Sequence, residues 1–175
     1  MENATNKQRR RIMLAGVGAM AVATAIELGR DGTASYPQGA PLAIGIGALA
    51  QGNLLVLEWQ GLPVWVLRRS TADIAALAQP SGALLDPDSR QSVQPPMCRN
   101  PQRSLRPEIF VAIGLCTHQG CAPALLGADG FLCPCHASRF DLAGRVFKRG
   151  PATSNLVIPA YRFETENRLL LGVNA

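Results

Sequence analysis

Apolar and polar positions divide the chain into four parts: a charged start, an uncharged apolar run, a Gly- and Pro-rich stretch, and a long remainder of short apolar segments. Lysine and arginine dominate residues 7–11, and residues 12–26 then carry no charge. A membrane-spanning helix needs roughly 17 to 25 apolar residues, and the core of a cleaved export signal needs fewer. We therefore expect residues 1–29 to form an export signal or a membrane anchor helix.

The basic residues before the apolar run have the order of a twin-arginine export signal. Arg10-Arg11-Ile12-Met13-Leu14 resembles that signal, although Arg9 stands where it usually carries Ser or Thr. A plain anchor that follows the positive-inside rule is the alternative. Both interpretations place the rest of the chain outside the cytoplasm.

Residues 30–41 are rich in Gly, Pro and small polar residues and show no apolar periodicity, which is typical of a flexible linker. We expect this stretch to tether a folded head, residues 42–175, to the N-terminal segment. The head has the length of one ordinary domain, so we expect no second independent domain.

Most of the head predicts short strands. Residues 53–59 and 63–69 are apolar, β-branched or aromatic, and Gln60-Gly61-Leu62 separates them, which favours a hairpin. Later strand-like pieces cover residues 108–115, 145–148, 156–159, 161–164 and 168–173, with a turn at Glu166-Asn167. Short strands separated by frequent turns indicate an all-β layered fold.

Two segments of the head depart from the strand pattern. Residues 70–77 predict one short helix, with Ser70 or Thr71 as N-cap and Asp73 in the first turn. Residues 79–107 are dominated by Pro, Asp, Ser, Gln and Arg and predict a long ordered loop with at most a helical turn.

The formal net charge of +5 raises the question of a nucleic-acid partner. Arg9, Arg10 and Arg11 supply three of these charges before the head begins, and the remaining charges are scattered. No Lys/Arg stripe interleaved with aromatic residues is present in the sequence. The basic balance therefore reflects targeting, and we expect no nucleic-acid partner.

Cysteine and histidine usage is more informative than charge. The chain has five Cys and two His, and both His and four of the Cys lie between residues 116 and 136. Cys98 is left over, and we interpret it as a small buried apolar residue or a free thiol. So dense a group of soft ligands in one short stretch indicates a metal or redox centre.

Two boxes supply these ligands: Cys116-Thr117-His118-Gln119-Gly120-Cys121 and Cys133-Pro134-Cys135-His136-Ala137-Ser138. A Rieske-type 2Fe-2S cluster needs two thiolates on one iron and two imidazoles on the other. We predict that Cys116, His118, Cys133 and His136 are these metal ligands, and that Ser138 donates a hydrogen bond at the cluster. A structural zinc site or a pure disulfide framework is the alternative.

The second cysteine of each box remains after the four ligands are assigned. Cys121 and Cys135 can pair with each other and clamp the two loops together, as suits an oxidising compartment. Gly120 and Pro134 favour tight turns that aim backbone N–H groups at the cluster sulfurs.

At these residues the sequence resembles the Rieske iron-sulfur subunit of quinol:cytochrome c oxidoreductase, the cytochrome bc complex, in its bacterial form. The likeness extends to flanking motifs, namely Leu85-Asp86-Pro87-Asp88-Ser89, Gln94-Pro95, Arg99-Asn100, Arg103-Ser104-Leu105-Arg106-Pro107-Glu108, Phe140-Asp141-Leu142-Ala143-Gly144-Arg145-Val146-Phe147-Lys148, Asn155-Leu156 and residues 159–161. The resemblance implies a layered antiparallel β-sandwich with a small inserted cluster-binding subdomain at about residues 109–150, after one membrane helix.

The resemblance also implies a mechanism. Quinol binds near the exposed imidazole of His136 and gives it a proton while one electron enters the cluster, and the second electron goes to cytochrome b. His118 is the other exposed ligand, and both histidines are the catalytic candidates. The head then swings on residues 30–41 to reach a cytochrome c-type haem. The implied setting is a dimeric complex of the bacterial inner membrane, with a single-pass anchor, a periplasmic head and a subunit inactive alone.

The sequence departs from the family pattern around the cluster. Gln119 replaces the usual Leu after the first histidine, Ala137 replaces the usual Gly after the second, and Phe140 stands where some members have a Tyr that hydrogen-bonds a cysteine sulfur. Residues 150–153 keep only part of the family's covering proline loop. Two other functions stay open: an electron-relay subunit of a periplasmic molybdenum oxidase such as arsenite oxidase, and a non-catalytic metal-stabilised module.

Overall fold

Three small antiparallel sheets build the head, with few helices, in a computed structural model that describes residues 36–79 and 82–175. The sheets have the orders β1-β9-β8, β2-β3-β4 and β5-β6-β7. The strands are β1 (Leu42–Gly45), β2 (Leu54–Trp59), β3 (Leu62–Arg68), β4 (Ile109–Ile113), β5 (Ala124–Leu125), β6 (Phe131–Leu132), β7 (Arg139–Phe140), β8 (Tyr161–Thr165) and β9 (Arg168–Leu171). The predicted all-β class is confirmed.

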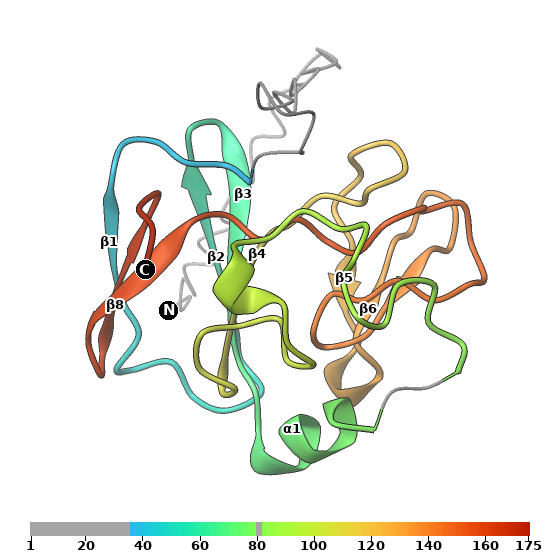
Figure 1. Ribbon diagram of the computed structural model, residues 1–175, viewed down its shortest axis with the longest axis horizontal. Coiled ribbons are helices and arrows are strands. Elements are labelled where there is room, and N and C mark those ends of the chain that lie inside the picture. The colour runs from blue at the N-terminus through green and yellow to red at the C-terminus, as the bar shows by residue number, and fades with distance from the viewer. Residues whose placement is uncertain (1–35, 80–81) are drawn as a thin grey trace, which may run out of the picture.

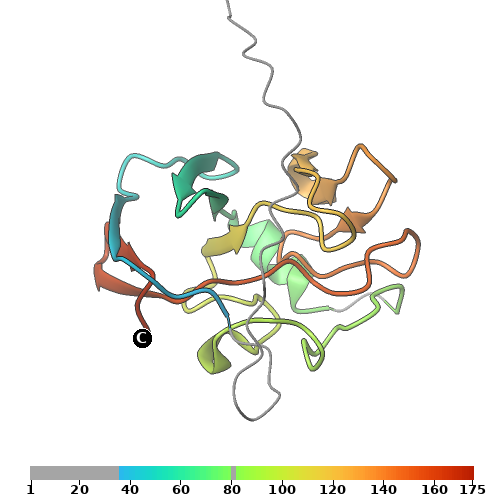
Figure 2. The same cartoon turned by 90° about the horizontal axis from the view of Figure 1, so that it is seen from above.

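The three sheets lie side by side along the molecule. In Figure 1 the sheet of β1 and β8 is at the left, β2, β3 and β4 are central, and β5 and β6 are at the right. The perpendicular view of Figure 2 also places the orange β5–β7 region away from the red C-terminal strands. The central sheet therefore joins a terminal sheet to a small subdomain that contains both ligand boxes.

The predicted hairpin is confirmed as β2 and β3. Leu54 pairs with Leu67 at one end and Trp59 with Leu62 at the other. Gln60 and Gly61 form the two-residue connection, with φ of 53° and 75°. Positive φ at both positions matches the twist of the flanking strands and defines the register of the hairpin.

The predicted helix is confirmed as α1, Thr71–Leu77, with Ser70 as its N-cap. The Ser70 hydroxyl accepts from the backbone N–H of Asp73 at 3.2 Å, and the Asp73 carboxylate accepts from the backbone N–H of Ser70 at 2.8 Å. This reciprocal capping box satisfies two N–H groups that a helix start otherwise leaves unpaired.

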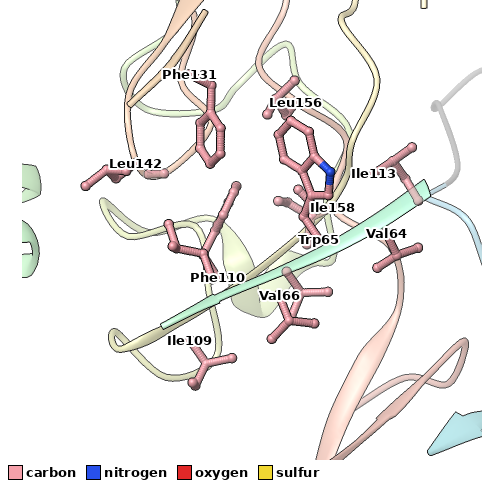
Figure 3. Close-up of a cluster of buried hydrophobic side chains, with 14 of the residues drawn as sticks. Val64, Trp65, Val66, Ile109, Phe110, Ile113, Phe131, Leu142, Leu156 and Ile158 are labelled. Atoms are coloured by element: carbon pink, nitrogen blue, oxygen red, sulfur yellow. The ribbon is translucent and has the colours of Figure 1, made fainter. Parts of the chain in front are cut away.

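An aromatic core connects the central sheet to the small subdomain. The rings of Trp65 on β3 and Phe131 on β6 stack with centroids 4.9 Å apart, and Phe110 on β4 lies 6.3 Å from Phe131. Figure 3 shows these side chains together with Leu142, Leu156 and Ile158. Since Phe131 lies two residues before Cys133, the core fixes the start of the second ligand box on the central sheet.

The long loop predicted for residues 79–107 contains one short helical turn, η1 (Pro96–Cys98), in its described part. Buried polar contacts order the loop. Arg103 is fully buried and donates to the carbonyl oxygens of Ala143, Gly144 and Leu156 and to the side-chain oxygen of Gln94, at 2.8 to 3.4 Å. Removal from water lowers the pKa of Arg103 to about 10. The loop is thereby tied to the segments that follow the second ligand box.

Two predicted strands are wrong. Residues 145–148 and 156–159 lie outside the named strands, although single bridges pair Phe140 with Val146 and Leu84 with Phe147. The N–H of Val146 bonds the side-chain oxygen of Asn155, and that of Ile158 bonds the Val93 carbonyl. Apolar runs of strand-like composition thus satisfy their backbone groups with loops and side chains. The sequence pattern also missed β1 and the β5–β7 sheet.

The C-terminal end of the predicted linker is bonded to the head. The Trp59 ring N–H donates to the Ala40 carbonyl at 2.8 Å, and the Ala160 N–H donates to the Pro37 carbonyl at 2.8 Å. The rest of the linker, residues 30–35, and the anchor predicted for 1–29 lie outside the described residues, so both stay predictions. Within residues 36–79 and 82–175, no helix has the length and apolarity that a membrane crossing requires.

Cys98 is the leftover cysteine, and its side chain is fully buried and free, as predicted. Its sulfur lies 3.9 Å from the hydroxyl of buried Tyr161. Burial raises the pKa of Cys98 to about 11, which keeps the thiol protonated.

Candidate metal centre

The two ligand boxes fold into loops with the same hydrogen-bond pattern. In the first, the Cys116 N–H bonds the Cys121 carbonyl at 2.8 Å and the Gly120 N–H bonds the Cys116 carbonyl at 2.9 Å. In the second, the Cys133 N–H bonds the Ser138 carbonyl at 2.8 Å and the Ala137 N–H bonds the Cys133 carbonyl at 3.0 Å. Both loops therefore turn back on themselves over six residues, with a cysteine at the first position.

The fifth residue of each loop adopts a left-handed backbone. Gly120 has φ of 75° and Ala137 has φ of 56°. The left-handed region costs an L-residue roughly 1–2 kcal/mol because the Cβ atom crowds the backbone. The methyl group that departs from the family pattern at Ala137 therefore sits at a position suited to glycine.

This equivalence predicts opposite effects for two exchanges. Ala137→Gly should raise the free energy of unfolding by about 1 kcal/mol, because it removes the left-handed strain at a small entropic cost. Gly120→Ala should lower it by a similar amount, since a Cβ built at Gly120 meets nothing within 4 Å and only the backbone is strained. Thermal unfolding midpoints of both variants check the pair, and a shift of the same sign in both would contradict it.

The two cysteines predicted as ligands lie close together as free, buried thiols. Cys116 is 4% and Cys133 1% exposed, and the Cys133 side chain is near enough to raise the pKa of Cys116. Burial raises the pKa of the Cys116 thiol, while hydrogen bonds from the His118 backbone N–H and the Ser138 hydroxyl act in the opposite direction. The predicted hydrogen bond from Ser138 at the cluster stays a prediction; its hydroxyl accepts from the backbone N–H of Ala152 at 3.1 Å.

The two histidine rings pack against each other. The His118 and His136 rings lie edge to face with centroids 4.8 Å apart. His118 Nδ1 is buried and has no hydrogen-bond partner in the described part of the chain, a state that costs about 1–3 kcal/mol for a polar atom. His136 is exposed and His118 is partly buried. An unpaired buried imidazole nitrogen fits a metal ligand.

These four side chains suit the 2Fe-2S cluster predicted from the sequence. Two thiols, two imidazoles and the unpaired His118 nitrogen make up the donor set that a Rieske-type cluster requires. The assignment of the four residues as ligands stays a prediction.

The predicted disulfide between Cys121 and Cys135 is present, with Cα atoms 6.6 Å apart. It links the last residue of the first loop to the third residue of the second loop. The sulfurs of Cys121, Cys133 and Cys135 all lie within 4.8 Å of one another. Since two of the three are bonded to each other, they offer a metal ion only one thiolate, and this group is no metal site by itself.

A third segment covers the ligand loops. The Thr117 hydroxyl donates to the Ser154 carbonyl at 2.7 Å, and the Ala152 N–H donates to the Ser138 hydroxyl at 3.1 Å. Gly150 has φ of 121°, and a Cβ there would lie 2.8 Å from the Cα of Ser138. The shortened proline loop therefore still packs on the second box.

Thr117 is a residue whose structural role the sequence analysis missed. Its partner is 37 positions away along the chain, and no local pattern marks such a contact.

Besides Ala137, two residues near the cluster depart from the family pattern. Phe140 is fully buried and offers no hydroxyl, and Gln119, next to His118 in the sequence, is exposed.

Comparison with known proteins finds one matching family model and related iron-sulfur subunits. The model described as "Rieske [2Fe-2S] domain" matches residues 97–162. The chain is 43% identical over 185 residues to the ubiquinol-cytochrome c reductase iron-sulfur subunit of Allochromatium vinosum, covering 95% of this chain and 89% of that protein. It is 38% identical over 136 residues to the mitochondrial cytochrome b-c1 complex subunit Rieske-1 of Nicotiana tabacum, covering 76% of this chain and 48% of the plant protein.

Among solved structures, a chain of a hyperthermophilic respiratory Complex III matches with a TM-score of 0.49 and 23% identity. The match covers 75% of this chain and 74% of that one.

Proposed function

The chain belongs to the Rieske family of iron-sulfur subunits, and from this premise we propose that it transfers single electrons from quinol to a cytochrome c-type haem. The observations that support the proposal are two loops of identical hydrogen-bond pattern, a buried free thiol at the start of each, and two imidazole rings with centroids 4.8 Å apart. Three-dimensional proximity of this donor set is what a shared 2Fe-2S cluster demands.

In this proposal Cys116 and Cys133 would hold one iron as thiolates, and His118 and His136 would hold the other through one imidazole nitrogen each. When bound, the cluster supplies one-electron redox chemistry at a potential above that of all-cysteine clusters. Ser138 would donate a hydrogen bond at the cluster, and such a donor favours added negative charge there.

Other tasks, namely proton transfer and the positioning of the two loops, belong to residues of the chain itself. His136, which is exposed, would accept the proton of quinol at the ring nitrogen that does not bind iron, once that nitrogen has lost its own proton, and the His118 ring packs against it. The Cys121–Cys135 disulfide and the Thr117–Ser154 hydrogen bond hold the loops in place. The Trp65–Phe131–Phe110 core holds the start of the second ligand loop on the central sheet.

The same proposal covers the setting of the subunit. Residues 1–29 anchor it in the bacterial inner membrane, with the head on the periplasmic side, and residues 30–35 act as the hinge. Cytochrome b and a membrane-bound c-type cytochrome are its partners in a dimeric complex, and the subunit alone has no quinol oxidase activity. The name of the Allochromatium vinosum relative supports the ubiquinol-cytochrome c reductase part of this proposal.

The proposal is tested by a redox titration of the native membranes, followed by electron paramagnetic resonance. The reduced cluster should give a signal whose shape or midpoint potential changes when an inhibitor of the quinol site is added. An unchanged signal would refute the quinol oxidase assignment and favour the relay subunit of a molybdenum oxidase. Zinc without acid-labile sulfide in the purified chain would refute the electron-transfer role itself.

A further inference from the structure

In the candidate metal centre, the free thiol of Cys133 lies next to the Cys121–Cys135 disulfide. The Cys133 sulfur lies within 4.8 Å of both sulfurs of the Cys121–Cys135 bond. Cys116, the other free thiol of the site, does not belong to this group of three. Thiol–disulfide exchange begins when a free sulfur attacks one sulfur of a disulfide, so Cys133 is placed for such an attack.

The chain geometry selects which sulfur Cys133 attacks. Only Pro134 separates Cys133 from Cys135, and its ring fixes φ near −65°, so a bond between these neighbours would close a small, strained ring. Cys121 belongs to the other loop and carries no such constraint. Cys135 is exposed, whereas Cys133 is 1% exposed. Attack on Cys121 therefore releases the sulfur of an exposed residue, Cys135.

We infer that the chain without its cluster rearranges its disulfide from Cys121–Cys135 to Cys121–Cys133. The Cys133 sulfur bonds to the Cys121 sulfur while the Cys121–Cys135 bond breaks. The proton lost from the Cys133 thiol is matched by one that the Cys135 thiol gains from solvent. One disulfide is lost and one is formed, so the step needs no oxidant and no reductant.

This inference rests on the proposed function, because it takes Cys133 to be a cluster ligand. Bound to iron, the Cys133 sulfur is not free to attack, and the native disulfide is preserved. After the exchange a ligand is consumed, and the rearranged chain can no longer hold the cluster. The consequence is that an oxidised chain must receive its cluster before the exchange takes place.

The experiment maps cysteines in the purified full chain. Iron and acid-labile sulfide are measured first, and iron is then removed under argon with acid and a chelator, without added thiol. Samples are labelled with N-ethylmaleimide at intervals, digested and sequenced by mass spectrometry. The maleimide tag should move from Cys133 to Cys135 over time, and a peptide linked through Cys121 and Cys133 should appear. A lasting tag on Cys133 with an intact Cys121–Cys135 bond would overturn the inference.

Two matched variants identify the attacking sulfur. Cys116→Ser and Cys133→Ser each lack one proposed ligand, so both lack the cluster. Cys116→Ser should still expose Cys135 to the maleimide, whereas Cys133→Ser should keep it protected. Equal labelling of Cys135 in both would overturn the inference. Because the wild-type chain is mapped directly, the result does not depend on either variant folding.

The outcomes separate this inference from the proposed function. Starting protein that contains iron and sulfide, but keeps its native disulfide after iron removal, overturns the exchange alone. Starting protein that contains neither overturns the cluster proposal, on which the exchange rests.

Discussion

Replacement of Cys116 by Ser should abolish the cluster, so that iron and acid-labile sulfide in the purified full chain fall to background. The thiolate is the form of cysteine that binds iron, and a serine hydroxyl stays protonated at neutral pH. The Cys116 side chain is also buried and free, and the second proposed thiolate ligand, Cys133, is near enough to raise its pKa. Iron analysis and the paramagnetic signal of the reduced protein measure the loss.

The control for this prediction is Cys98→Ala. Cys98 is equally buried and free, but its side chain contacts the Tyr161 hydroxyl on β8, and it belongs to neither ligand box. This variant should keep its full iron and sulfide content, although truncation of a buried side chain lowers stability somewhat. Full cluster content in Cys116→Ser would show that the four-ligand assignment is wrong.

Replacement of Arg103 by Met should destabilise the head by roughly 3–5 kcal/mol. Arg103 is fully buried and serves three backbone carbonyl oxygens and the Gln94 side chain. Met fills similar space but leaves these acceptors without a donor, and a buried acceptor without a partner costs about 1–3 kcal/mol. The midpoint and slope of urea unfolding, followed by circular dichroism, give the change.

The matched control is Arg162→Met, because Arg162 is exposed on β8. Exchanges at such surface positions usually stay within about 0.5 kcal/mol. Arg103→Lys retains the positive charge but lacks the planar fork that reaches several acceptors, so it should remain well below wild type. Wild-type stability in Arg103→Lys would mean that charge alone matters at this position.

Most of the candidate site was predictable because its ligand residues lie only a few positions apart in the sequence. Each box holds a cysteine and a histidine within four residues, and the spare Cys121 and Cys135 pointed to the disulfide that the structure contains. The β2–β3 hairpin and α1 could equally be predicted from the sequence. Gln60-Gly61 and the Ser70–Asp73 capping box act over two to four residues, so their signals are local.

Features that depend on residues far apart in the sequence could not be predicted from local patterns. Strands β5, β6 and β7 have two residues each, too few to show an alternating pattern. Residues 145–148 have the apolar pattern of a strand, but Asn155 takes the N–H of Val146 that a neighbouring strand would need.

The sequence by itself determined the ligand types, their spacing and the predominance of β-strands. Only the tertiary structure decided that Arg103 belongs in the interior, that Thr117 holds the covering segment through Ser154, and that the Cys133 sulfur lies beside a disulfide. The physical reason is the distance along the chain over which each kind of interaction acts. Ligand spacing and turn chemistry act between near neighbours, whereas burial and hydrogen-bond partners are set by segments that meet only after the chain has folded.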